Sequence, residues 1–72
     1  MNDKLKKILT DNREAWLAYA VDEEELSESL YDALYEYFCT AGEMPYGVAK
    51  ARTGDPYCWI GERMDKYIDF RP

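Results

Sequence analysis

The chain has 72 residues, of which nine are Lys or Arg and fifteen are Asp or Glu, so its formal net charge is −6. A chain of this length forms one domain, which we expect to span residues 1–72. It contains no His, and so it lacks the usual general base, the base that activates a Ser or Cys nucleophile, and an imidazole metal ligand. The two Cys residues, Cys39 and Cys58, match no zinc-ligand spacing. We therefore expect a protein that is not an enzyme and that binds no metal ion or cofactor.

No segment has the composition of a membrane anchor or a secretory signal. The longest apolar runs fall well short of the ~18 residues that a transmembrane helix needs. The N-terminal residues, Met1–Lys7, are basic, but no long apolar stretch follows them. Two Cys residues in a chain without a secretory signal favour reduced thiols and a cytoplasmic location, with a single disulfide as the alternative.

The first predicted helical segment covers residues 3–20. Asn12 interrupts its apolar stripe, and Asp11 with Glu14 fits a capping box, which would start a new helix. The sequence therefore predicts either one helix or a short helix followed by a second. The apolar residues that recur at helical spacing are Leu5, Ile8, Leu9, Trp16, Tyr19 and Ala20.

The second predicted helix covers residues 22–41, where Asp22 and Glu25 fit a capping box and Gly42 follows as a C-cap. The apolar stripes of the first two segments are nearly in phase, so one continuous helix across residues 20–22 would also be amphipathic. We favour a break there, because a compact monomer can hide both stripes only by folding its helices against each other. A continuous helix would instead favour a dimer.

A loop-rich stretch follows, with a possible short helix over residues 45–52. The third predicted helix covers residues 55–69, with Asp55 as N-cap and Pro56 at the first helical position. The sequence shows no strand signal, so the predicted fold class is all-α: a small compact three-helix domain with an irregular or short helical segment between the second and third main helices. The expected core residues are Leu5, Leu9, Trp16, Tyr19, Leu30, Leu34, Tyr37, Phe38, Ile60, Met64 and Ile68.

The negative charge is concentrated in residues 21–43, which hold eight acidic residues and no Lys or Arg. One-turn spacing places four of these carboxylates in a ridge on the second helix, with two Tyr side chains beside it. Such a ridge is either a solvated face that maintains solubility or a recognition face for a basic surface on a partner protein, such as a nucleic-acid-binding protein. The candidate partner-binding residues are Glu25, Glu28, Tyr31, Asp32, Tyr35 and Glu36.

A secondary candidate surface lies on the third helix, where Trp59, Arg63 and Lys66 share a face. Trp and Arg are typical of the energetically dominant residues of interfaces. The favoured interpretation is nevertheless structural: Trp59 packs under residues 45–52, and Arg63 lies over its ring.

These features favour a non-enzymatic protein-binding module with a basic protein surface as its partner. By analogy, small acidic helical proteins without catalytic residues are common among phage and mobile-element products that inhibit host machinery, which suggests an inhibitor. We expect no membrane partner and no direct nucleic-acid partner. The chain can be a monomer or a homodimer.

Two alternatives stay open. The first is a helix-turn-helix-like nucleic-acid-binding regulator that uses residues 45–69, with positive charge from Lys50, Arg52, Arg63 and Lys66. Against it, the net charge of −6 would repel DNA phosphates, and the third helix does not open on base-reading side chains. The second alternative is a self-associating structural protein, because the chain holds seven Tyr, two Trp and two Phe.

Overall fold

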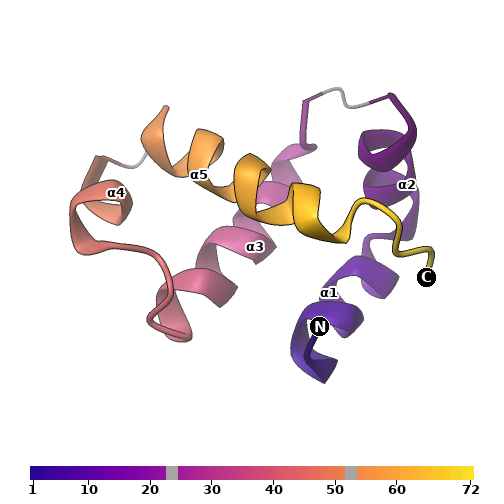
Figure 1. The fold of residues 1–72 in the computed structure, drawn as a ribbon, viewed down its shortest axis with the longest axis horizontal. Helices are drawn as coiled ribbons and strands as arrows, with labels where there is room; N and C mark the ends of the chain where they lie inside the picture. Colours follow the sequence, from indigo (N-terminus) through magenta and orange to yellow (C-terminus); the bar gives the residue numbers. More distant parts are fainter. Residues whose placement is uncertain (23–24, 52–53) are drawn as a thin grey trace.

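A computed structural model describes residues 1–22, 25–51 and 54–72 of the chain. Within these ranges there is no strand, and the predicted all-α class is confirmed. The predicted number of three main helices is wrong, because the described residues form four α-helices of nine or more residues and a short fifth. Helices α3 and α5 cross in the middle of the molecule, with α1 and α2 on one side and α4 on the other (Figure 1). In chain order the helices are α1 (Asp3–Asp11), α2 (Arg13–Asp22), α3 (Glu28–Thr40), α4 (Tyr46–Ala51), α5 (Asp55–Met64) and the 3₁₀ helix η1 (Asp65–Tyr67).

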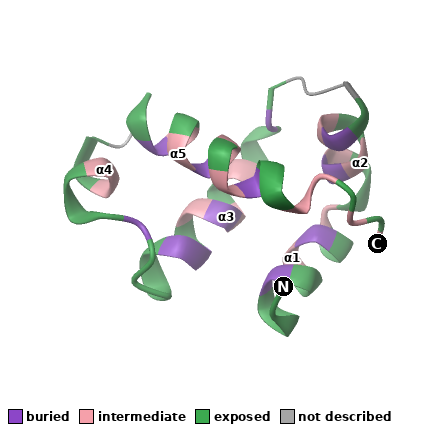
Figure 2. Cartoon of the chain, viewed as in Figure 1, coloured by how far each residue is buried: buried purple, intermediate pink, exposed green. Residues whose placement is uncertain are grey.

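The core is formed by the inward faces of α1, α2, α3 and α5, whereas α4 contributes no buried residue (Figure 2). Most of the predicted core is confirmed, but Tyr19 and Ile68 are only half-buried. Ala20, Leu26 and Met44 are buried in addition. The buried apolar residues are Leu5, Leu9, Trp16, Ala20, Leu26, Leu30, Leu34, Tyr37, Phe38, Met44, Ile60 and Met64.

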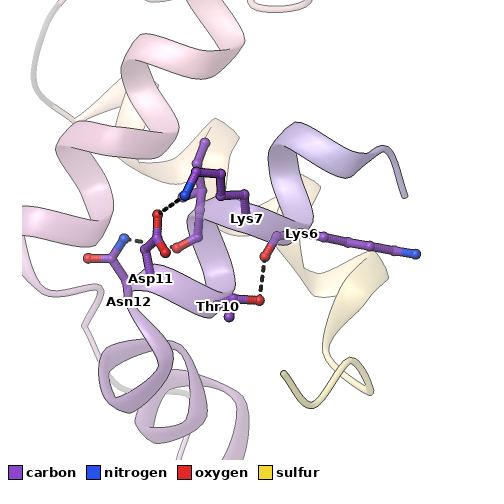
Figure 3. Close-up of polar contacts among 6 residues, drawn as sticks. Lys6, Lys7, Thr10, Asp11 and Asn12 are labelled. Carbon is purple, nitrogen blue, oxygen red and sulfur yellow. Dashed lines mark hydrogen bonds and ion pairs between the residues drawn. The ribbon is translucent and has the colours of Figure 1, made fainter.

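Asn12 divides the first predicted segment into α1 and α2. Its backbone angles leave the helical range (φ −115°, ψ 39°), and its side-chain amide donates to the Ile8 carbonyl at 2.9 Å (Figure 3). The carbonyl of Asn12 then accepts from the backbone N–H of Trp16 at 2.9 Å, which begins α2. Asp11, the predicted cap, instead pairs with Lys7 at 3.1 Å. The short helix followed by a second helix is therefore the correct alternative.

The predicted break between the first two segments is confirmed, but its position differs. Helix α2 continues to Asp22, and residues 25–27 are not helical, so the capping box that we expected at Asp22 and Glu25 is wrong, as is a continuous helix. The hydroxyl of Ser27 is the N-cap of α3, because it accepts from the backbone N–H of Leu30 at 3.3 Å. The expected first-turn acids at positions 23 and 24 lie outside the described residues.

The late start of α3 has a tertiary cause. The backbone N–H of Leu26 donates to the hydroxyl of Tyr57 on α5 at 2.9 Å. The side chain of Leu26 is buried in the core, so this residue is held by contacts from another helix. In a helix that began at Asp22, the backbone N–H of Leu26 would donate to a helical carbonyl, and its hydrogen bond to Tyr57 would be lost.

Helix α3 ends at Thr40, with Ala41 as its C-cap, and the predicted stop residue Gly42 follows with a φ of +72°. The backbone N–H of Gly42 donates to the Cys39 carbonyl and that of Glu43 to the Phe38 carbonyl, both at 3.1 Å. This pair of bonds is the Schellman motif, in which a residue in the left-handed region closes the helix.

The last third of the chain holds the expected short helix, α4, and the expected third main helix. The N-cap of α5 is Gly54, with a φ of +72°, and the predicted cap Asp55 is the first helical residue. Pro56 lies in the first turn, where its missing N–H costs no helical bond. The α-helix ends at Met64 and continues only as η1, so it is shorter than predicted. Residues 52 and 53 lie outside the described residues.

The C-terminal segment lies against α2 (Figure 1). The indole N–H of Trp16 donates to the Phe70 carbonyl at 2.8 Å, and Arg13 Nε donates to the Pro72 carbonyl at 2.9 Å. The ring of Trp16 is fully buried, so its one polar group is satisfied by this segment.

Candidate functional site

Helix α3 buries one face and exposes the other. Leu30, Leu34 and Phe38 are at most 1% exposed, which fixes the helix against the core. The opposite side carries three exposed carboxylates that follow one another at intervals of one helical turn. We call these three residues, Glu28, Asp32 and Glu36, the acidic face of α3.

Among the residues that the structure describes, no ion pair to a carboxylate of the acidic face is found. The two ion pairs found there join Lys7 to Asp11 at 3.1 Å and Arg63 to Glu43 at 3.8 Å. Like charges one turn apart repel each other, by a few tenths of a kcal/mol per pair. Lys4 and Lys7 line the same groove as Glu36, so cations lie near one end of this face without forming an ion pair with it.

The predicted ridge is wrong at its first member. Glu25 is exposed, but it lies in the non-helical stretch before Ser27, so helical spacing does not align it with Glu28. The ridge that the structure supports begins at Glu28, because α3 begins there.

Tyr31 and Tyr35 lie beside the acidic face, as expected, but both are half-buried. The hydroxyl of Tyr35 donates to the Ala49 carbonyl at 2.7 Å, which ties α3 to α4. The ring of Tyr31 packs against Tyr35 and Tyr57, with centroid distances of 6.0 and 5.6 Å. These contacts hold the two rings in place beside the acidic face.

Of the secondary candidate residues, Trp59 and Arg63 make contacts within the fold. Trp59 is half-buried and packs edge-to-face on Phe38, with 5.1 Å between ring centroids. The guanidinium of Arg63 lies 4.8 Å from the Trp59 ring centroid and also pairs with Glu43. The expectation that Arg63 covers the Trp59 ring is confirmed. Lys66 is exposed and lies in η1, beyond the end of α5.

An open groove of about 540 Å³ separates α1 from α3, and sequence reasoning did not predict it. Lys4, Lys7 and Ile8 contribute to it from α1. From α3 it is lined by Ala33, Glu36 and Tyr37. The groove exists only because α1 lies beside α3, so no local sequence pattern predicts it. Of its lining residues, the sequence had singled out Glu36, as a member of the acidic ridge.

The N-terminal end of α1 is fixed to α3 at this groove. The side-chain oxygen of Asn2 accepts from the backbone N–H of Leu5 at 2.9 Å, so Asn2 is the N-cap of α1. Its side-chain amide also donates to the hydroxyl of Tyr37. One side chain therefore caps α1 and joins it to α3.

The described residues include two free cysteines and no cluster of metal ligands. Cys39 and Cys58 are both free and exposed, so the alternative of a disulfide is wrong. Over residues 1–22, 25–51 and 54–72, no cluster of three His, Cys, Asp or Glu side chains is arranged to hold a metal ion. Over the same ranges, no helix combines the length and the apolar character needed to cross a membrane.

A comparison with protein-family models, curated proteins and solved structures finds no match to this chain. Functional inference therefore rests on its own residues and their geometry.

Proposed function

We propose that this protein is a non-enzymatic protein-binding module that presents the acidic face of α3 to a basic surface on a partner protein. One observation carries the proposal: three carboxylates that form no ion pair among the described residues lie at one-turn intervals on the exposed side of a helix whose other side is fixed in the core.

Electrostatics supports a basic partner. Carboxylates four residues apart are separated by about 6 Å along the helix axis, so a row of Lys or Arg side chains would relieve their mutual repulsion. A field of one sign also steers an oppositely charged partner during encounter. A nucleic-acid-binding protein has such a basic surface, and occupation of that surface would inhibit it.

The helix-turn-helix alternative has weaker support. The would-be recognition helix α5 and its C-cap expose Asp55, Glu62 and Asp65, whose charge has the wrong sign for DNA phosphates. Arg63, which was to supply positive charge, is engaged by Trp59 and Glu43. The expected turn and Arg52 fall on residues 52–53, outside the described residues.

The self-association alternative rests on exposed aromatic and apolar side chains. Tyr46 is 80% exposed and Val21 is 69% exposed, but they lie on different helices, α4 and α2. Single exposed apolar residues are normal on monomeric proteins. Light scattering of the purified chain at micromolar concentration will distinguish a monomer from a homodimer.

The experiment that tests the proposal compares two triple variants. Glu28→Gln, Asp32→Gln and Glu36→Gln together remove the acidic face, while Glu14→Gln, Asp55→Asn and Glu62→Gln remove three other exposed carboxylates. Both variants change the net charge equally, so a difference between them reports the location of the charge.

The partner is first captured from the native host and identified by mass spectrometry, and its binding to each variant is then measured. We expect the acidic-face variant to bind severalfold more weakly, chiefly through slower association, and the wild-type complex to weaken as salt is added. Folding, followed by circular dichroism, should be unchanged or slightly improved. If the acidic-face variant binds as fast and as tightly as the wild type, the face serves only solubility.

A further inference from the structure

The groove between α1 and α3 borders the acidic face, because Glu36 lines the groove and is a member of that face. Its least exposed lining residues are Ile8, Ala33 and Tyr37, which are half-buried or buried. The inner lining is therefore largely apolar, and the exposed side chains of Lys4 and Glu36 stand at its rim.

The two rims carry opposite charge. On the α1 side, Lys7 pairs with Asp11 at 3.1 Å, and the two side chains point toward each other (Figure 3), so Lys4 supplies the uncompensated charge of that rim. On the α3 side the charge is that of Glu36. Among the described residues, neither Lys4 nor Glu36 forms an ion pair, so each charged group can still make a direct contact with a bound segment.

The size and openness of the groove fit side chains from another protein. Its volume of about 540 Å³ lies within the range of sites that bury a ligand. Because the groove is open along the surface between two helices, it can receive a helical segment that lays apolar side chains into it.

We infer that this groove receives an amphipathic segment of the partner, whose apolar side chain lies between Ile8 and Ala33, with a basic residue toward Glu36 and an acidic residue toward Lys4. This inference rests on the proposed function, since it makes the groove part of the same interface. Charge complementarity to the two rims fixes the orientation of the segment, and the apolar lining supplies contact area that the acidic face lacks.

The test uses a random library of displayed peptides of about 12 residues, long enough for about three helical turns, selected on the immobilised full chain. We expect the enriched peptides to share an apolar residue with Lys or Arg on one side and Asp or Glu on the other, at helical spacing. A selection without enrichment would overturn the inference.

A matched pair of variants locates the bound peptides. Ala33→Leu fills the groove, and Ala18→Leu makes the same change at an exposed position of α2. Enriched peptides should bind the Ala33→Leu chain about tenfold or more weakly and the Ala18→Leu chain as tightly as the wild type. Equal binding to the wild type and to the Ala33→Leu chain contradicts the inference.

Charge reversal tests the orientation. The chain with both Lys4→Glu and Glu36→Lys should select peptides in which the order of basic and acidic residues is exchanged. The amide chemical shifts in the NMR spectrum of the wild-type protein provide a check that needs no variant. Bound peptide should change the amide shifts of Ile8 and Ala33 and leave those of α5 unchanged. Perturbation confined to α5 would overturn the inference.

These results separate the inference from the function on which it rests. Partner binding that depends on Glu28 and Asp32 but not on Ala33 retains the proposed function and removes the groove from the interface. Partner binding that depends on Ala33 but not on Glu28 or Asp32 retains the groove and contradicts the acidic face as the recognition surface.

Discussion

Among single residues, Tyr31 shows how the fold changes the chemistry of a side chain beside the acidic face. Partial burial raises the pKa of the Tyr31 hydroxyl above its ordinary value of 10.0, and the neighbouring Tyr35, Asp32 and Cys39 raise this pKa further. A phenolate at this position would meet both desolvation and negative charge. Tyr31 therefore stays neutral throughout the physiological range and adds no charge to the face.

The raised pKa of Tyr31 predicts a dependence of stability on alkaline pH. The folded state holds the Tyr31 proton more tightly than the unfolded chain does. Tyr31 therefore contributes fully to the free energy of unfolding below the unfolded pKa of about 10, and this contribution is lost as the pH rises through the folded pKa. Tyr31→Phe keeps the ring but removes the titrating group. We expect the free energy of unfolding, from urea titrations between about pH 9 and about pH 11, to fall less steeply in the variant than in the wild type.

The control is Tyr46→Phe, which removes a hydroxyl from a ring that is 80% exposed. Its pH profile should follow that of the wild type. If the Tyr31→Phe and wild-type profiles are parallel, partial burial of Tyr31 has no effect on its titration.

At the level of helices, two glycines differ in the backbone conformation that they adopt. Gly42 closes α3 with a φ of +72°, whereas Gly47 lies inside α4 and has no positive φ. At both positions a Cβ would meet no atom of the described residues within 4 Å. The same substitution therefore tests backbone conformation alone.

Alanine at these two positions should have opposite effects. Gly42→Ala forces an L-residue into the left-handed region and should lower the free energy of unfolding by about 1–2 kcal/mol. Gly47→Ala reduces the freedom of the unfolded chain and should raise the free energy of unfolding by about 0.4–1 kcal/mol. Thermal and urea unfolding of the two variants measure this difference. A stabilised Gly42→Ala chain would show that α3 can end without a left-handed residue.

For the whole molecule, α3 is the central element, because it contacts both α1 and α5. Leu34 lies in the middle of its inward face and is fully buried. Leu34→Ala removes apolar contacts and leaves a cavity, so we expect it to lower the free energy of unfolding by ~2–5 kcal/mol. Urea unfolding followed by circular dichroism measures the loss, and it should occur in one transition for all helices.

Leu34→Met is the matched control, since it nearly conserves volume and should cost less than ~1.5 kcal/mol. A loss for Leu34→Ala no greater than that of the control would mean that the α1–α3–α5 contact is not the centre of stability. Such an outcome would also mean that burial of the inward side of α3 does not fix the position of the acidic face.

The candidate site was predictable only in its local part. Glu28, Asp32 and Glu36 could be grouped from sequence because helical periodicity fixes which residues share a face. Glu25 was wrongly placed on the same helix face, since its position depends on where α3 begins. The groove was not predictable, because Ile8 and Ala33 approach each other only once α1 lies beside α3.

The sequence by itself determined the all-α class, the stripes that form the core, the stop at Gly42 and the concentration of negative charge in residues 21–43. These features depend on residues within a few positions of one another, where helical spacing and backbone conformation act directly. The tertiary structure decided the start of α3, where the N–H of Leu26 bonds to Tyr57, and the satisfaction of Trp16 by the C-terminal segment. It also decided the groove. The bond of Leu26 to Tyr57, the bond of Trp16 to the C-terminal segment and the groove each join groups far apart in the chain, and they meet only when the helices pack. The local part of the start of α3 is its cap, Ser27.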